Sequence, residues 1–264
     1  MSEPLLRTRG LCRRFGGLQA VAELDLEAHP GEILGLIGPN GAGKSTTFNM
    51  IAGTLAPSAG TIEFAGRSMA GLLAHDFAAC GILRTFQHNK PFASMSVLDN
   101  VMVGMHTKIG LSLWQVLATT RASREAETRC RTLAKALIEF VGLGERQSAD
   151  VSTLSFGQGR LLETARALAG SPRLILFDEP AAGLSPVELL RLGEIIRAIA
   201  AQGIAVVLIE HDMRFLMSLA ERVIVLNFGR TIAEGTPDEV SAHPAVMEAY
   251  LGQAGAGAVS RAHA

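Results

Sequence analysis

Nine consecutive residues in the first fifth of the chain have the types and spacing that phosphate binding requires. Residues 38–46 read Gly-Pro-Asn-Gly-Ala-Gly-Lys-Ser-Thr, between an apolar run and a helix-like segment, and these flanks disfavour a glycine-rich turn with an incidental lysine. In such a P-loop, backbone N–H groups point at phosphate oxygens and the helix N-terminus adds its dipole. Lys44 is expected to reach the β- and γ-phosphates of ATP, and the Ser45 hydroxyl to bind Mg²⁺. The expected nucleotide-binding residues are Gly38, Pro39, Asn40, Gly41, Ala42, Gly43, Lys44, Ser45 and Thr46.

Two acidic residues follow a second apolar run, Leu-Ile-Leu-Phe-Asp-Glu. Asp178 lies at the carboxyl end of a predicted strand, where open α/β sheets bind ligands, and is expected to hold Mg²⁺. Glu179 is expected to orient and deprotonate the water that attacks the γ-phosphate. Acidic residues at strand ends are often only turn formers, but the P-loop in the same chain favours the metal and base roles.

Two further stretches are ambiguous when taken alone. Residues 154–160 read Leu-Ser-Phe-Gly-Gln-Gly-Arg and hold no acid, base or metal ligand. Ser155 with Gly157 predicts either an anion site without a charged side chain or an ordinary capped helix. His211 follows another apolar run, from which its side chain could reach the γ-phosphate, although a lone histidine is more often an ordinary surface or core residue.

The rest of the pattern predicts an α/β core with two additions. Four short runs rich in Ile, Val and Leu, at 32–38, 173–179, 203–210 and 222–227, fit strands buried on both faces of a parallel sheet. An apolar stripe predicts a helix over 186–200. Residues 5–27 and 60–68 predict a small antiparallel sheet, residues 95–168 an inserted helical subdomain without a clear strand, and residues 252–264 a flexible tail.

Composition narrows the class of protein. The 264 residues carry a formal net charge of −1, which leaves no electrostatic footprint for general nucleic-acid binding. Cys12, Cys80 and Cys130 lie far apart and predict idle thiols rather than a metal site or disulfides. The apolar runs are shorter than a membrane-spanning helix requires, so the chain is expected to be cytoplasmic, with any membrane role supplied by a partner.

Six motifs in order make the chain similar to the ATP-binding subunits of ABC transporters over nearly its whole length. Residues 38–46 resemble the Walker A loop, and residues 174–179 resemble Walker B. "RTFQHNKPF" resembles the Q-loop, which implies that Gln87 contacts Mg²⁺ or the water. "LSFGQ" resembles the signature motif, and His211 the switch histidine. Phe15 stands where an aromatic side chain usually stacks on adenine, although it could be plain core.

The resemblance implies an ABC-type P-loop NTPase with a RecA-like α/β core, a small antiparallel β subdomain and an inserted helical subdomain. One ATP-binding domain is expected over 1–251, with the core at 1–87 and 166–238, the helical subdomain at 88–165 and a C-terminal helix at 239–251. Two such subunits meet head to tail, which implies that Ser155, Gly157 and Gln158 serve the nucleotide of a facing subunit.

Several stretches are similar to the ATPases of branched-chain amino-acid importers, among them "RFGGLQAV", "GILRTFQ" and "IEHDM". This implies integral membrane permeases, a second ATPase subunit and, indirectly, a periplasmic solute-binding protein as partners, at the cytoplasmic face of the inner membrane. Urea or amide uptake, lipopolysaccharide or lipid export and, more remotely, a soluble ABC ATPase acting on nucleic acid or ribosomes remain open. Phe156, Gly159 and Ser185 depart from the wider family's pattern, which leaves the contacts of Gly159 and Ser185 undetermined.

Overall fold

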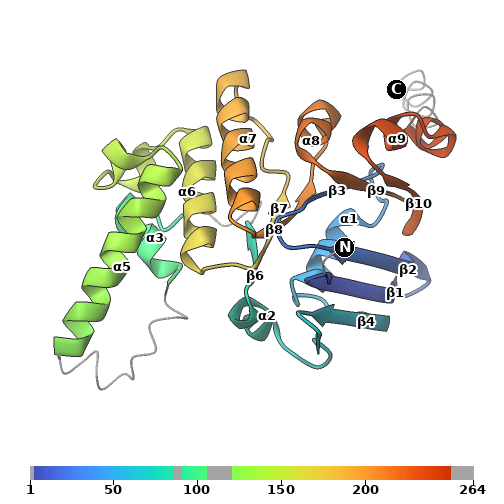
Figure 1. The fold of residues 1–264 in the computed structure, drawn as a ribbon, viewed down its shortest axis with the longest axis horizontal. Helices are drawn as coiled ribbons and strands as arrows, with labels where there is room; N and C mark the ends of the chain where they lie inside the picture. Colours follow the sequence, from blue (N-terminus) through green and yellow to red (C-terminus); the bar gives the residue numbers. More distant parts are fainter. Residues whose placement is uncertain (1–2, 86–90, 106–120, 251–264) are drawn as a thin grey trace.

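A computed structural model describes residues 3–85, 91–105 and 121–250, and it contains two sheets with helices around them (Figure 1). The larger sheet has six strands in the order β10-β9-β3-β8-β7-β6. Its neighbours pair in parallel, except that β10 runs antiparallel to β9. Its strands are β3 (Ile33–Ile37), β6 (Ile82–Thr85), β7 (Leu174–Asp178), β8 (Ala205–Ile209), β9 (Arg222–Asn227) and β10 (Arg230–Gly235).

The four apolar runs therefore form strands of one sheet, as predicted. Three of these strands, β3, β7 and β8, are buried at every position. The short strand β6 and the polar strand β10 were not predicted, because neither carries a long apolar run. Both lie at the edges of the sheet, where fewer residues need to be apolar.

The smaller sheet is antiparallel, in the order β2-β1-β4-β5. It confirms the antiparallel sheet predicted from residues 5–27 and 60–68. Figure 1 shows it beside the carboxyl-terminal strands of the larger sheet and away from α5. Its strands are β1 (Leu6–Phe15), β2 (Leu18–Ala28), β4 (Ala59–Phe64) and β5 (Arg67–Ser68).

Helices dominate the segment between β6 and β7. There α3 (Val97–Val103), α5 (Arg121–Phe140) and α6 (Phe156–Ala169) pack against one another at one end of the molecule (Figure 1). Within the described residues of 95–168, the β pairing is a single isolated bridge between Ser96 and Asp150, in agreement with the helical prediction. No helix in the described part of the chain is both long enough and apolar enough to cross a membrane.

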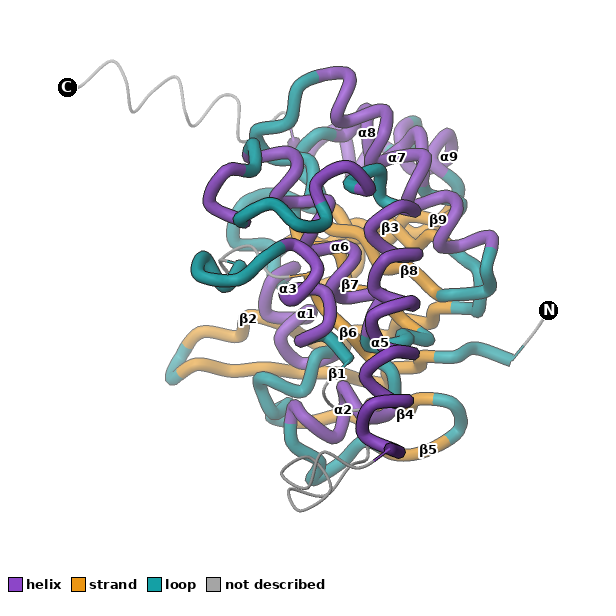
Figure 2. Tube along the Cα trace, turned by 90° about the vertical axis from the view of Figure 1, so that its left-hand side faces the viewer, coloured by secondary structure: helices purple, strands orange, loops and turns teal. Residues whose placement is uncertain are grey.

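The remaining helices flank the two sheets. Figures 1 and 2 both place α7, α8 and α9 at the end of the molecule opposite α2. The helices that flank the sheets are α1 (Lys44–Ile51), α2 (Ala74–Cys80), α7 (Pro186–Ala201), α8 (Met213–Leu219) and α9 (Pro237–Ser241).

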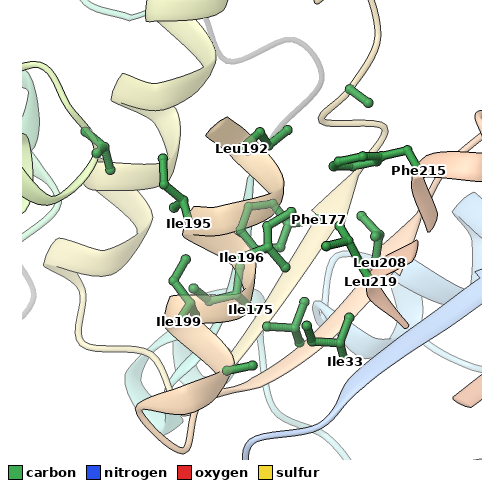
Figure 3. Close-up of a cluster of buried hydrophobic side chains, with 14 of the residues drawn as sticks. Ile33, Ile175, Phe177, Leu192, Ile195, Ile196, Ile199, Leu208, Phe215 and Leu219 are labelled. Atoms are coloured by element: carbon green, nitrogen blue, oxygen red, sulfur yellow. The ribbon is translucent and has the colours of Figure 1, made fainter. Parts of the chain in front are cut away.

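Each face of the six-stranded sheet has its own hydrophobic core. Because successive strand residues point to opposite faces, Ile175 and Phe177 join one cluster while Leu174 and Leu176 join the other. Figure 3 shows the first cluster, where a stripe on α7 packs over strands β3, β7 and β8. Because β3, β7 and β8 pair in parallel, their carboxyl ends lie along one edge, next to the P-loop, Asp178, Glu179 and His211. The residues of the α7 stripe that Figure 3 labels are Leu192, Ile195, Ile196 and Ile199.

The C-terminal segment differs from the single helix expected over 239–251. Helix α9 begins at Pro237, capped by the Thr236 hydroxyl, and ends at Ser241. Helical backbone resumes only at residues 244–250. The break has a local cause, since Pro244 has no N–H to donate to the preceding turn and disfavours a helical conformation at His243.

Candidate functional site

The loop between β3 and α1 turns through three glycines with positive φ, at 150° for Gly38, 79° for Gly41 and 103° for Gly43. A Cβ on Gly38 would lie 2.1 Å from the carbonyl oxygen of Leu226, and one on Gly43 would lie 2.4 Å from that of Ala20. A side chain at either position would therefore collide with the backbone of β9 or β2. Gly41 faces open space, so its glycine is needed for conformation alone.

Lys44 opens helix α1, and its side chain folds back over this loop. Its Nζ donates hydrogen bonds to the carbonyl oxygens of Gly38 at 2.6 Å and Pro39 at 3.0 Å. Burial lowers the pKa of the Lys44 ammonium, and the negative charges of Glu179 and Asp178 oppose that shift. The ammonium thus lies close enough to both carboxylates for their charges to act on it, so the loop after β3 lies beside the end of β7.

Asp178 is the last residue of β7 and is buried. It forms an ion pair with Arg84 of β6, whose guanidinium also donates to Asn49 Oδ1 at 2.6 Å. Arg84 was not predicted, because it lies 94 residues from Asp178 and meets it only through the parallel pairing of β6 with β7. A cation therefore compensates the carboxylate that was predicted to hold Mg²⁺.

Glu179 and His211 face each other across the ends of β7 and β8. The distance from His211 Nε2 to Glu179 Oε1 is 2.8 Å. Glu179 has a φ of 49°, which a non-glycine residue rarely adopts, and its backbone N–H donates to the Ile209 carbonyl oxygen at 2.9 Å. The predicted base and the predicted switch histidine therefore form a direct pair, held by a strained backbone position of the kind found at functional sites.

The serine of residues 154–160 caps α6. Its hydroxyl accepts the Gln158 N–H at 3.2 Å, and Gln158 Oε1 accepts the Ser155 N–H at 3.0 Å. The capped-helix interpretation is therefore confirmed as local structure. A Cβ on Gly157 would lie 2.0 Å from Glu188 Oε1, so the glycine also lets the start of α7 approach α6 closely. Ser185, a departure from the family pattern, caps α7 through Glu188.

Four other residues were predicted to contact the nucleotide, the metal or the water. Phe15 ends β1 with 46 % of its surface exposed, so the alternative of plain core is wrong. The Arg13 guanidinium lies 4.7 Å from the centre of its ring. The Ser45 hydroxyl belongs to an exposed residue at the start of α1, and Thr46 is half-buried. Gln87 lies outside the described residues.

The residues present fit a magnesium nucleotide. Glycines with positive φ and a helix N-terminus form the loop, and a buried ammonium lies beside it. Within the described residues no cluster of three or more His, Cys, Asp or Glu side chains could hold a metal. Mg²⁺ does not require one, since it usually keeps several waters and takes one or two carboxylates with substrate phosphates. Asp178 and Ser45 would supply the carboxylate and the hydroxyl.

Comparisons with known proteins identify similar sequences and similar structures. Residues 21–182 match the ABC transporter family, and residues 230–256 match the branched-chain amino acid ATP-binding cassette transporter family. The chain is 42% identical to the high-affinity branched-chain amino acid transport ATP-binding protein LivG of Salmonella typhimurium, over 96% of this chain and all of that protein. It is 35% identical to the lipopolysaccharide export system ATP-binding protein LptB of Acidithiobacillus ferridurans, over 96% of this chain and 98% of that protein. A solved ATP-binding cassette of an ABC transporter in its ADP conformation has a TM-score of 0.83 and 30% identity, covering 95% of this chain and all of that one.

Proposed function

Because the chain belongs to the ABC transporter family of ATP-binding cassettes, we propose that it is the ATP-hydrolysing subunit of an importer for branched-chain or other hydrophobic amino acids. The observation that carries the activity is the Glu179–His211 pair at 2.8 Å, within electrostatic reach of the P-loop lysine. The likeness to LivG supports the substrate class, and the second family match over 230–256 points the same way.

Each side chain has a proposed part in hydrolysis. The backbone of residues 38–46 and Lys44 bind the phosphates of ATP, and Phe15 stacks on the adenine. Ser45, Asp178 and Gln87 hold Mg²⁺, which neutralises phosphate charge when bound. Glu179 takes a proton from the attacking water, and His211 orients Glu179 and the γ-phosphate.

The capped start of α6 has its role in trans. Ser155, Gly157 and Gln158 present a hydroxyl and backbone N–H groups at a helix N-terminus, which suits an anion without any charged side chain. We assign these residues to the nucleotide held by a facing ATPase subunit in a head-to-tail dimer. ATP binding then closes the dimer, and hydrolysis reopens it.

The proposed organisation follows from this role. The nucleotide-binding core comprises residues 1–87 and 166–238, and the helical subdomain comprises residues 88–165. The chain attaches to integral membrane permeases at the cytoplasmic face of the inner membrane, and a periplasmic binding protein delivers the solute. Nucleic acid is not among the partners.

Glu179→Gln tests the assignment of the base. The amide keeps the shape of the side chain but cannot take a proton, so turnover is expected to fall by about 10²-fold or more while ATP remains bound. Phosphate release measures turnover, and equilibrium dialysis with ATP measures binding. We also expect the variant to form a dimer that persists in the presence of ATP. Size-exclusion chromatography measures this dimer. Hydrolysis at the wild-type rate would remove Glu179 from this role.

A second candidate function is lipopolysaccharide or lipid export, which the 35% identity to LptB favours. The two functions predict different activators of the same ATPase. In proteoliposomes holding the chain with its permeases, an amino acid and its binding protein stimulate hydrolysis if the chain serves an importer. Stimulation by lipopolysaccharide instead would support the exporter, and stimulation by urea or an amide would support the related uptake systems.

A further inference from the structure

A third carboxylate lies beside the Glu179–His211 pair, and the proposed chemistry leaves it without a role. Glu210 directly follows β8 and is only 4% exposed. Within the described residues no ion pair involves it. Burial raises the pKa of the Glu210 carboxyl, while hydrogen bonds from the backbone of Ala181, His211 and Asp212 oppose that shift.

The two oxygens of this carboxylate face different loops. Oε1 accepts the backbone N–H of Ala181 at 2.6 Å, and Oε2 accepts that of His211 at 3.1 Å. Ala181 belongs to the loop after β7, two residues beyond Glu179, whereas His211 belongs to the loop after β8. One buried side chain therefore ties the loop that carries the proposed base to the loop that carries the proposed histidine.

The position is a costly one for a carboxylate. Burying a charge without a cation is unfavourable, and Glu179 adds a repulsive negative charge nearby. Both oxygens act as acceptors for backbone N–H groups, which suits the ionised form. An apolar residue would avoid the desolvation cost but would leave the Ala181 and His211 N–H groups without this acceptor.

The strain at Glu179 explains why such a tie is needed. Glu179 holds a φ of 49°, and it contacts the end of β8 through its N–H to the Ile209 carbonyl oxygen and the following loop through the pair with His211. The Glu210 carboxylate adds a third connection at Ala181, two residues further along the loop after β7. With all three in place, the two loops cannot slide apart without breaking a buried hydrogen bond.

We propose that Glu210 is a positioning residue for ATP hydrolysis, whose carboxylate fixes the loop after β7 to the loop after β8 so that Glu179 and His211 stay paired. This inference rests on the proposed function, because it takes Glu179 as the base. It assigns Glu210 no contact with nucleotide, metal or the attacking water.

Glu210→Gln in the full-length chain is the central test. The amide keeps the size of the side chain but has a single acceptor, so it can hold one of the two loops and presents an N–H group to the other. We expect kcat to fall by about 10-fold to 100-fold, as a misplaced catalytic group predicts, while the Kd for ATP changes by less than about twofold. Hydrogen exchange should become faster in peptides covering 179–185 or 210–212 and stay unchanged in β3.

Two further variants separate positioning from charge and from general damage. Glu210→Asp keeps the charge but is one methylene shorter, so it should lose activity as Gln does; wild-type kcat in this variant would show that charge alone matters and would overturn the proposal. Glu194→Gln is the control, because Glu194 is exposed on α7 and pairs only with Arg191 at 3.2 Å among the contacts described. It should leave kcat, Kd and exchange unchanged.

The outcomes are distinct from those for the proposed base. Wild-type kcat in Glu210→Gln, loss of ATP binding in step with kcat, or a fall in kcat without faster exchange in either loop would each overturn the positioning role. If Glu210→Gln does not fold, Glu210→Asp carries the same measurements. If Glu179→Gln keeps its turnover while Glu210→Gln loses both turnover and loop protection, the base assignment fails and the tie between the loops stands.

Discussion

At the scale of single residues, the site depends on backbone conformations that side chains oppose. Gly38 and Gly43 each lie where a Cβ would meet a carbonyl oxygen, whereas Gly41 lies in open space. Glu179 adopts a positive φ despite having a side chain, which costs on the order of 1–3 kcal/mol. The P-loop therefore has two glycines that are needed for space, Gly38 and Gly43, and one that is needed for its conformation alone, Gly41.

Alanine substitutions distinguish these two requirements. Gly43→Ala adds a Cβ 2.4 Å from the Ala20 carbonyl oxygen as well as a strained φ, whereas Gly41→Ala adds only the strain. We expect Gly41→Ala to lower the free energy of unfolding by about 1–2 kcal/mol. Gly43→Ala should lower it further, because backbone atoms must move to make room. Urea unfolding followed by circular dichroism measures both; equal losses would contradict the packing argument.

At the scale of elements, a half-buried arginine connects the two sheets through several hydrogen bonds. Arg222 at the start of β9 donates from Nε to Glu32 Oε1 at 2.8 Å and from Nη2 to the Glu27 carbonyl oxygen of β2 at 2.6 Å. It also pairs with Glu234 of β10. Its contacts therefore connect the antiparallel sheet, the segment before β3 and the edge of the parallel sheet. The same strand β2 packs against Gly43 of the P-loop through the backbone of Ala20.

Removing this junction should be costly. Arg222→Ala leaves Glu32, which is 9% exposed, without its cation, and the free energy of unfolding is expected to fall by about 2–4 kcal/mol. Arg230→Ala is the matched control, since it removes only an exposed pair with Glu23 and should cost less than about 1 kcal/mol. Denaturant titration of both variants checks the contrast, and similar losses would show that the network is not a structural junction.

At the scale of the whole molecule, the proposed site is divided between two chains. The P-loop and the acidic residues lie at the edge of the six-stranded sheet, while the capped start of α6 belongs to the helical region. Head-to-tail pairing would bring the second group of one subunit to the first group of the other. Each dimer then holds two composite sites, and each subunit contributes to both.

Mixing two inactive variants tests this division. Ser155→Arg blocks the anion site of α6 but should leave ATP binding intact, whereas Lys44→Ala removes the phosphate contact and should abolish binding. Alone, neither variant should hydrolyse ATP. An equal mixture places one intact composite site in about half of the dimers, so activity should reappear. Phosphate release in the mixture is the measurement; loss of binding in Ser155→Arg, or no recovery on mixing, would contradict the head-to-tail site.

The elements with strong local signals were predicted correctly. The P-loop, the four apolar strands and the capped helix α7 each depend on residues that are close in sequence, such as Ser185 and Pro186 before the α7 stripe. The break at Pro244 also has a local cause but was missed. Strands β6 and β10 were missed for a different reason, since edge strands lack the long apolar runs of central ones.

The sequence by itself determined the class of core, the phosphate loop and the identity of the acid and histidine side chains, because backbone conformation and burial follow from neighbouring residues. Only the tertiary structure decided which distant groups meet. Arg84 pairs with Asp178, Arg222 with Glu32, and Glu210 accepts from Ala181, across separations of 94, 190 and 29 residues. Strand order brings these partners together, and strand order depends on packing of the whole chain rather than on any local pattern.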